Sequence, residues 1–246
     1  TSDSTVLYSP YFEQITDKNS PLLKRNIQYF RWPLEDIVRR GYAVVTMCYQ
    51  DIFPDKADGT PSSVIPLFPE SHDGDAHWQA LGAWAWGSSR IADWVRRQPW
   101  ANVGQIVIIG HSRQGKAALW AGAQDERFQV VISNNSGCGG AALSKRAYGE
   151  TVGRITRSFP HWFCPAFSRY AENEQAMPFD QHELLALIAP LRLYVASAEE
   201  DKWADPLGEF LAAQATSPVY ALYGLKGIES TTMISRSEER FSRNAE

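Results

Sequence analysis

The sequence predicts an α/β fold in which helices cover a mostly parallel central sheet. Short β-branched runs alternate with stretches of helical periodicity, and one stretch, QIVIIGHSRQGK at 105–116, joins a strand to a helix through a turn. The chain has 246 residues, 44% of them hydrophobic, which is enough for a sizeable core. We therefore expect a single domain over residues 1–246.

In chain order, the first third should contain a helix, a strand and a long loop. Residues 1–30 are polar and interrupted by prolines, so we expect an irregular segment there. Pro33–Arg40 fits a short helix that Gly41 ends, and Tyr42–Tyr49 (YAVVTMCY) fits a buried strand. The loop at 51–74 is rich in Pro, Asp and Ser; loops of this length are often functional, with disorder as the alternative.

The remaining elements alternate between helix and strand. Apolar residues recur at helical spacing from Asp75 to Arg97, which predicts a long amphipathic helix. The apolar run after Gln105 suits a central strand covered on both faces. The later elements are a helix from Lys116, strands at Gln129–Ser133 and Leu191–Ala198, a helix at Pro206–Ala215 and a strand at Val219–Tyr223.

Ser112 should lie at the tip of the turn between the apolar strand and its helix. A serine held there projects its hydroxyl above the sheet, and the N–H groups that open the helix point at an oxyanion formed beside it. The usual pattern of this nucleophile elbow is G-x-S-x-G, whereas this chain has G-x-S-x-x-G. A plain glycine-rich turn is therefore the competing interpretation.

Composition argues against several classes of partner. A net charge of −4 provides no basic stripe for nucleic acid or for an anionic membrane, and no stretch approaches the length of a membrane span. The three cysteines allow at most one disulfide and match no zinc-ligand spacing. The nine tryptophans fill the core or stack on sugar rings, and both interpretations stay open.

A serine nucleophile needs a histidine base and an acid, in the order Ser, acid, His along an α/β-hydrolase chain. Four carboxylates follow the strand at Leu191–Ala198, namely Glu199, Glu200, Asp201 and Asp205. None of the five histidines follows them. His161 and His182, which lie between Ser112 and these acids, are expected to be structural rather than general bases.

The chain resembles the bacterial type of glucuronoyl esterase, carbohydrate esterase family 15. The resemblance covers about Arg31 to Met233 and includes RWPLEDIVRRGYAVVT, ALGAWAWGSSRIADWV, GHSRQGKAALWAGAQDERFQVVISNNSGCGGAAL, YGETVGRI, FPHWFC, DQHELLALIAP and YVASAEEDKWADPLGEF. It implies an α/β-hydrolase fold, a three-layer sandwich with a mostly parallel central sheet. Residues 234–246 resemble nothing in the family and form an atypical tail.

The resemblance also implies roles for individual residues. Ser112 matches the serine that attacks an ester between 4-O-methyl-glucuronic acid on xylan and a lignin alcohol. Arg113 matches the arginine that helps to build the oxyanion site. Lys116, Glu150 and Trp203 match residues that hold the sugar, where Glu150 replaces a glutamine of many members.

Two features depart from the family pattern. Many members carry the catalytic glutamate where this chain has Asn135, so we expect Asp201 in DKWADP to be the acid. The family's base histidine lies in a closing segment of the kind GYHxRxGKH, which is not present here. We therefore expect a chain truncated before the catalytic histidine.

The sequence thus predicts a serine carboxylester hydrolase that forms an acyl-enzyme on Ser112 and requires no metal or organic cofactor. The alternative is a glucuronate-binding derivative with impaired turnover, and an acyltransferase or lipase on the same elbow is a weaker third. We expect esters of glucuronoxylan as partners, no nucleic acid or membrane partner, a monomer, and a secreted or periplasmic location. Cys138 and Cys164 should be neighbours, bonded or not according to compartment.

Overall fold

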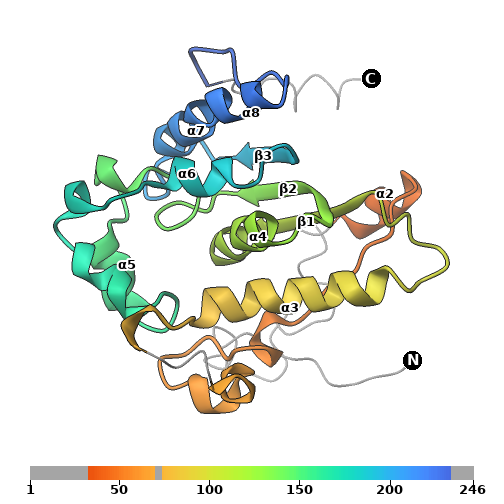
Figure 1. Cartoon of the computed structure of the whole chain (residues 1–246), viewed down its shortest axis with the longest axis horizontal. Helices are drawn as coiled ribbons and strands as arrows, with labels where there is room; N and C mark the ends of the chain where they lie inside the picture. The colour runs from red at the N-terminus through yellow and green to blue at the C-terminus, as the bar shows by residue number, and fades with distance from the viewer. Residues whose placement is uncertain (1–32, 70–73, 234–246) are drawn as a thin grey trace, which may run out of the picture. The chain divides into compact units, whose positions relative to one another are not determined.

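The computed structural model describes residues 33–69 and 74–233 (Figure 1). The chain divides into two compact units, Thr1–Thr46 and Met47–Glu246. The irregular segment expected at 1–30 and the atypical tail at 234–246 lie outside the described residues. A single domain over the whole chain stays a prediction.

The described part of the first unit contains helix α2, Leu34–Arg39, which confirms the short helix expected there. The strand predicted at Tyr42–Tyr49 is wrong. Residues 42–48 have no regular structure, Tyr42 is 62% exposed, and residues from Tyr49 onward turn into a short 3₁₀ helix. Apolar β-branched residues favour a strand only where a neighbouring backbone pairs with them, and no described strand does so here.

The second unit is built on a parallel three-stranded sheet in the order β1-β2-β3. The strands are Ile106–His111, Phe128–Asn134 and Arg192–Ala196. His111 is paired with Asn134, and Asn134 with Ala196, so all three strands end at the same level. The loops that leave these carboxyl ends therefore emerge together at one edge of the sheet.

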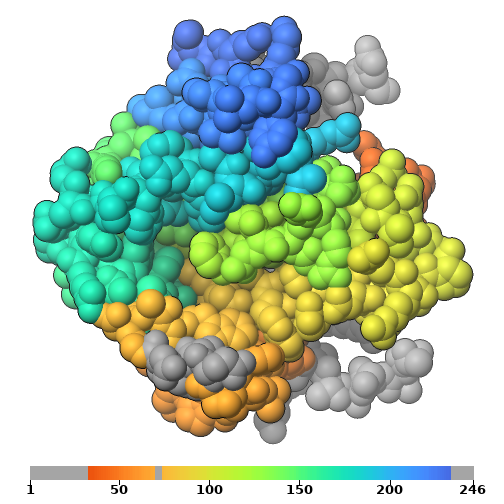
Figure 2. Space-filling view, in the orientation of Figure 1, coloured from red at the N-terminus to blue at the C-terminus, as the bar shows by residue number. Residues whose placement is uncertain are grey.

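Helices cover one face of this sheet. On the face seen in Figures 1 and 2, neighbouring helices are in contact in the order α3, α4, α6 and α7. Their buried side chains form a core with the strands that includes Leu119, Val131 and Ile188. The helices of this unit are α3 Ala80–Val95, α4 Arg113–Gln124, α5 Val152–Ser158, α6 Gln181–Ala186, α7 Pro206–Ala215 and α8 Ser217–Leu222.

Two expectations for the strands need correction. Strand β1 lies at the edge of the described sheet, and its Ile109 is 68% exposed, so the described residues of this unit cover only one of its faces. The strand predicted at Val219–Tyr223 is wrong, because residues 219–222 lie in α8 and Tyr223 caps its end. Pro218, at the start of that helix, fixes a backbone angle that suits a first helical turn.

The segment 51–69 is an irregular loop, as expected, and it packs into a second core. Its short 3₁₀ helices are η4, Thr60–Ser62, and η5, Ile65–Leu67. Phe53 and Ile65 are fully buried, and the indole of Trp84 on α3 donates a 2.9 Å hydrogen bond to the carbonyl of Phe53. Disorder, the alternative interpretation, is therefore excluded for these described residues.

The two glycines of the G-x-S-x-x-G pattern let β1 and α4 approach closely. A Cβ on Gly110 would lie 2.0 Å from the carbonyl oxygen of Gln114, on the first turn of α4. A Cβ on Gly115 would lie 3.0 Å from Cβ of Ser136 and 3.2 Å from the carbonyl oxygen of Gly110. The turn between them is tight enough to place Ser112 at its tip with φ of 55° and ψ of −123°.

We expect Gly110→Ala to destabilise the protein, because the backbone of Gln114 must move to admit the methyl group. The free energy of unfolding, measured by urea denaturation, should fall by about 1–3 kcal/mol or more. Gly104→Ala is the matched control, since its Cβ would meet only the side chain of Asn102 at 3.5 Å. Equal stability of the two variants would contradict this account of the turn.

Candidate active site

Ser112 occupies the sharp turn between β1 and α4, as the sequence predicts. Its N–H donates to the carbonyl of Asn134 at the end of β2 (2.9 Å), and its own carbonyl accepts from the N–H of Lys116 (3.1 Å). The residue is half-buried, and its hydroxyl has no hydrogen-bond partner among the described residues. The serine is therefore held by its backbone while its Oγ is free to react.

Asp201 and Asn135, the two positions considered for the acid, meet in the structure. The side-chain amide of Asn135 donates to Oδ2 of Asp201 at 2.6 Å, and the carbonyl of the same amide accepts from the N–H of Ala198 at 3.1 Å. Asn135 adopts φ of 53°, a left-handed conformation that asparagine tolerates better than most residues. These hydrogen bonds thus join the loop after β2 to the loop after β3.

Glu150 and Trp203 also lie together. The N–H of Glu150 donates to the carbonyl of Trp203 at 2.9 Å, and the Glu150 carboxylate hydrogen-bonds to the Trp203 side chain. Gly149 makes this approach possible, because its φ is 67° and a Cβ there would lie 2.4 Å from the carbonyl oxygen of Trp203. Glu150 lies just before α5 rather than within it, and the Trp203 side chain is half exposed.

Lys116 is buried on α4, only 4% exposed, and its Nζ donates to the carbonyl of Ser136. Burial lowers the pKa of Lys116, although the nearby Glu150 carboxylate opposes the shift. Burial likewise raises the pKa of Glu150, although Lys116 and the hydrogen bond from Trp203 oppose it. For both groups the loss of hydration outweighs the attraction between them.

Arg113, the first residue of α4, forms an ion pair with Asp55 from the long loop at 51–69. Sequence reasoning missed Asp55, since 57 other residues separate the two positions along the chain. The only signal available was that a loop of this length is often functional.

The described histidines do not supply a base to Ser112. Nε2 of His161 lies 2.9 Å from Oδ1 of Asp55, and Nδ1 of His77 lies 2.6 Å from the carbonyl of Gly74. His182 has its Nδ1 buried without a partner among the described residues, and His111 is exposed. His72 lies outside the described residues. None of the four described imidazoles hydrogen-bonds to Ser112.

A buried carboxylate on α7 holds the loops of the site in place. Glu209 is fully buried and accepts hydrogen bonds from the Ser136 hydroxyl (3.1 Å), the N–H of Gly137 (2.8 Å) and the Ser197 hydroxyl. These donors come from the loops after β2 and β3. Asp205, one of the alternative acids, caps the start of α7 and pairs with Arg146, which gives it a structural role.

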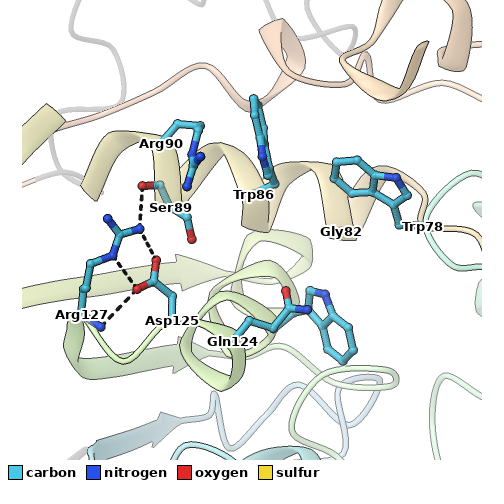
Figure 3. A pocket seen from close by; sticks show the side chains of 9 residues that line it. Trp78, Gly82, Trp86, Ser89, Arg90, Gln124, Asp125 and Arg127 are labelled. Carbon is cyan, nitrogen blue, oxygen red and sulfur yellow. Dashed lines mark hydrogen bonds and ion pairs between the residues drawn. The ribbon is translucent and has the colours of Figure 1, made fainter. Parts of the chain in front are cut away.

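A hollow that does not include Ser112 lies between α3 and α4 (Figure 3). It measures about 540 Å³, and its aromatic lining comes from Trp78, Trp86 and Trp120. Other tryptophans, such as the fully buried Trp84, belong to the core. The tryptophans of this chain therefore divide between core packing and exposed surfaces.

The described residues contain no group of three or more His, Cys, Asp or Glu side chains arranged to hold a metal ion. Cys138 and Cys164 carry free thiols and contribute to the same core cluster. Burial raises the pKa of the Cys138 thiol to about 12, so this thiol is not a nucleophile at neutral pH. Among the described residues there is also no helix long and apolar enough to cross a membrane.

Comparison with known proteins identifies related sequences and structures. A family model described as glucuronyl esterase, fungi, matches residues 27–224. Carbohydrate esterase MZ0003 from an unknown prokaryotic organism is 44% identical over 220 residues, which is 88% of this chain and 50% of that protein. The 4-O-methyl-glucuronoyl methylesterase 1 of Wolfiporia cocos is 34% identical over 194 residues, 75% of this chain and 47% of that protein.

A solved glucuronoyl esterase from Solibacter usitatus superimposes with a TM-score of 0.79 at 48% identity, covering 83% of this chain and 53% of that one. This confirms the α/β-hydrolase fold class predicted from the sequence. The chain spans about half the length of the curated relatives that it matches.

We expect Glu150→Gln to change how stability depends on pH. The pKa of Glu150 is 4.5 in the unfolded chain and higher in the folded protein. The contribution of Glu150 to stability therefore falls as the pH rises from about 4.5 through the raised pKa. The variant should lack this decline. Its free energy of unfolding, measured in urea, should therefore increase relative to that of the wild type as the pH rises across this range. Glu172→Gln, on the exposed carboxylate paired with Arg157, is the control. Parallel curves for wild type and Glu150→Gln would contradict the assignment.

Proposed function

This chain belongs to the glucuronoyl esterases, carbohydrate esterase family 15, and from that membership we propose that the protein hydrolyses 4-O-methyl-glucuronoyl esters linking glucuronoxylan to lignin alcohols. One observation carries the proposal most directly. Ser112 stands at the strand-to-helix turn with its hydroxyl uncommitted, beside Arg113 and at the edge where the loop bearing Asp201 emerges. These are the parts that acyl transfer to a serine requires.

In the proposed reaction, Ser112 Oγ attacks the ester carbonyl carbon and gives its proton to a base. The negative charge that develops on the carbonyl oxygen is stabilised by Arg113 and by N–H groups at the start of α4. Collapse expels the alcohol, which takes a proton from the protonated base, and leaves an acyl-enzyme on Ser112. Water then releases glucuronic acid by the same steps, and Asp201 orients the imidazole throughout.

The sugar-binding side of the proposal rests on Trp203 and Glu150. The half-exposed Trp203 ring offers a face on which a pyranose ring can stack, and Glu150 fixes this indole through hydrogen bonds to its backbone and side chain. Lys116 interacts electrostatically with Glu150, and its Nζ donates to the carbonyl of Ser136. We propose that Lys116 contributes positive charge, and a donor to a sugar hydroxyl once substrate displaces that contact.

The bacterial type of the family is supported by the higher identity to prokaryotic relatives, 44% and 48%, than to the fungal enzyme, 34%. We propose a secreted or periplasmic location, because a polymeric ester of the plant cell wall cannot reach an enzyme inside the cell. The proposed reaction needs no metal or organic cofactor. We further propose that the protein acts as a monomer.

One observation favours a second candidate, a glucuronate-binding protein with impaired turnover. No described histidine hydrogen-bonds to Ser112, whereas Lys116, Glu150 and Trp203 come together without one. Esterase activity at Ser112 therefore requires an imidazole from outside the described contacts. Binding does not.

We expect a form of the protein that carries the family's base-histidine segment to hydrolyse benzyl glucuronate, and residues 1–246 alone to do so very slowly or not at all. In the active form, Ser112→Ala should reduce turnover to residual catalysis while methyl glucuronate still binds. Removal of a triad member leaves on the order of 10³–10⁴-fold acceleration over water. Product release by chromatography and binding by calorimetry measure the two properties. Hydrolysis that survives in Ser112→Ala would overturn the proposal, and tight binding without hydrolysis in the form that carries the histidine segment would establish the second candidate.

In a form of the protein that carries the base histidine, we expect Asp201→Asn to lower kcat by up to about 10⁴-fold with little change in KM, because an amide cannot stabilise the imidazolium. Glu200→Gln, on an exposed residue of the same turn, is the matched control and should retain activity. The hydrolysis of benzyl glucuronate measures both variants. Full activity of Asp201→Asn would instead assign the acid to Glu199, Glu200 or Asp205.

A further inference from the structure

We propose that Asp55 is a positioning residue that holds the Arg113 guanidinium in place beside Ser112. The inference rests on the proposed function, since Arg113 stabilises an oxyanion only if Ser112 attacks an ester. It assigns a role to a carboxylate in the long loop at 51–69, far from the elbow in sequence. Three sets of contacts carry it.

The Asp55 carboxylate accepts hydrogen bonds from four side chains. Oδ1 accepts from Nε2 of His161 (2.9 Å) and Nε1 of Trp162 (2.8 Å). Oδ2 accepts from Nη1 of Arg113 and from the hydroxyl of Tyr49 (3.2 Å). The Asp55 side chain is only 4% exposed, so these donors replace its hydration. Both oxygens are fixed in direction, and the carboxylate forms a rigid anchor.

Arg113 is held from two directions. Its Nη1 is bound to Asp55, and its Cζ lies 4.7 Å from the Trp162 ring and 5.5 Å from the Phe159 ring. These two rings stack on each other at 3.8 Å and 4°. Trp162 therefore contacts both members of the ion pair: its indole N–H donates to the Asp55 carboxylate, and its ring face packs against the Arg113 guanidinium. Within the described residues, Asp55 is the only hydrogen-bond acceptor of the Arg113 side chain, whose other N–H donors stay available.

The protonation state of Asp55 suits this role. Burial alone would favour the neutral acid, but the hydrogen bonds from His161 and Trp162 and the charge of Arg113 hold the pKa of Asp55 well below its usual range. The anchor is therefore ionised at any pH at which a serine hydrolase works. A flexible arginine would lose orientation, and an oxyanion donor is effective only when it is pre-positioned.

The loop that carries Asp55 is held by other contacts. Phe53 is fully buried, its carbonyl accepts from the Trp84 indole, and the N–H of Val64 donates to the carbonyl of Ile52 at 3.0 Å. The backbone around position 55 thus keeps its place without the carboxylate. A variant at Asp55 should chiefly release Arg113 rather than unfold the loop.

The test is a double-mutant cycle on benzyl glucuronate hydrolysis with Asp55→Asn and Arg113→Ala, in the form that carries the base histidine. Asparagine keeps the size of the side chain, but it lacks the negative charge and replaces one acceptor oxygen with an NH₂ group, which cannot accept the hydrogen bonds that Asp55 receives. We expect Asp55→Asn to lower kcat by about 10- to 100-fold with KM nearly unchanged. Arg113→Ala should lower kcat by about 100- to 1000-fold. If Asp55 acts through Arg113, the double variant should match Arg113→Ala within about twofold.

Asp180→Asn is the matched control for this cycle. Asp180 is 5% exposed and accepts from the backbone N–H groups of Ser144 (2.7 Å) and Gln181 (2.8 Å), without contact to Arg113. Whatever Asp180→Asn does to kcat should be the same in the wild-type and Arg113→Ala backgrounds. Multiplicative effects of Asp55→Asn and Arg113→Ala would overturn the inference and leave Asp55 a structural residue.

A second measurement does not depend on turnover. Rotation about the Cζ–Nη bonds of Arg113, followed by NMR of the guanidinium nitrogens, should be slow in the wild type, faster in Asp55→Asn and unchanged in Asp180→Asn. Slow rotation in Asp55→Asn would overturn the inference. An inactive parent form that carries the base histidine, with this expected rotation pattern, would refute the esterase function alone, so the two failures are distinguishable.

Discussion

The candidate site depends on one buried carboxylate, Glu209, which joins the carboxyl ends of β2 and β3 to α7. Taking a carboxylate out of water is costly, and burial raises the pKa of Glu209 even though hydroxyl and N–H donors surround it. If Ser136, Gly137 or Ser197 moved away, the buried Glu209 carboxylate would lose a hydrogen bond that water could not replace. The loops that carry Asn135 and Asp201 are therefore constrained to stay together, which is what a site assembled from separate strands requires.

Arg113 and Lys116 each lie near one carboxyl group, and these two carboxyl groups differ in their pKa. Asp55 has four hydrogen-bond donors and its pKa is lowered, whereas Glu150 has fewer donors and its pKa is raised by burial. Arg113 is therefore paired with a carboxylate that stays ionised, whereas Lys116 lies near a carboxyl group whose pKa is raised by burial. In the proposed mechanism this division is useful, because the oxyanion needs a constant positive charge, while the sugar-binding side must exchange its contacts for those of substrate.

Local patterns predicted the elements whose signals are local, and long-range contacts decided the rest. Helix α3, the elbow and strand β2 have clear periodicity or turn chemistry, so the sequence located them. The segments Tyr42–Tyr49 and 219–223 have the same β-branched and aromatic content as true strands, but strands also need partners, which composition does not show. Asp55 could not be found, because its four donors are distributed from Tyr49 to Trp162 and only the folded chain brings them together.

The contact between Asn135 and Asp201 links the two positions that the sequence analysis considers for the acid. The two side chains approach to 2.6 Å, so two carboxylates there would repel each other and one would take up a proton. An amide at Asn135 avoids this, since its NH₂ donates to Asp201 while its carbonyl binds Ala198. The amide at Asn135 therefore orients Asp201 through a hydrogen bond and adds no second negative charge beside it. In the proposed mechanism, the departure at Asn135 and the acid at Asp201 are thus a single coupled feature of the site.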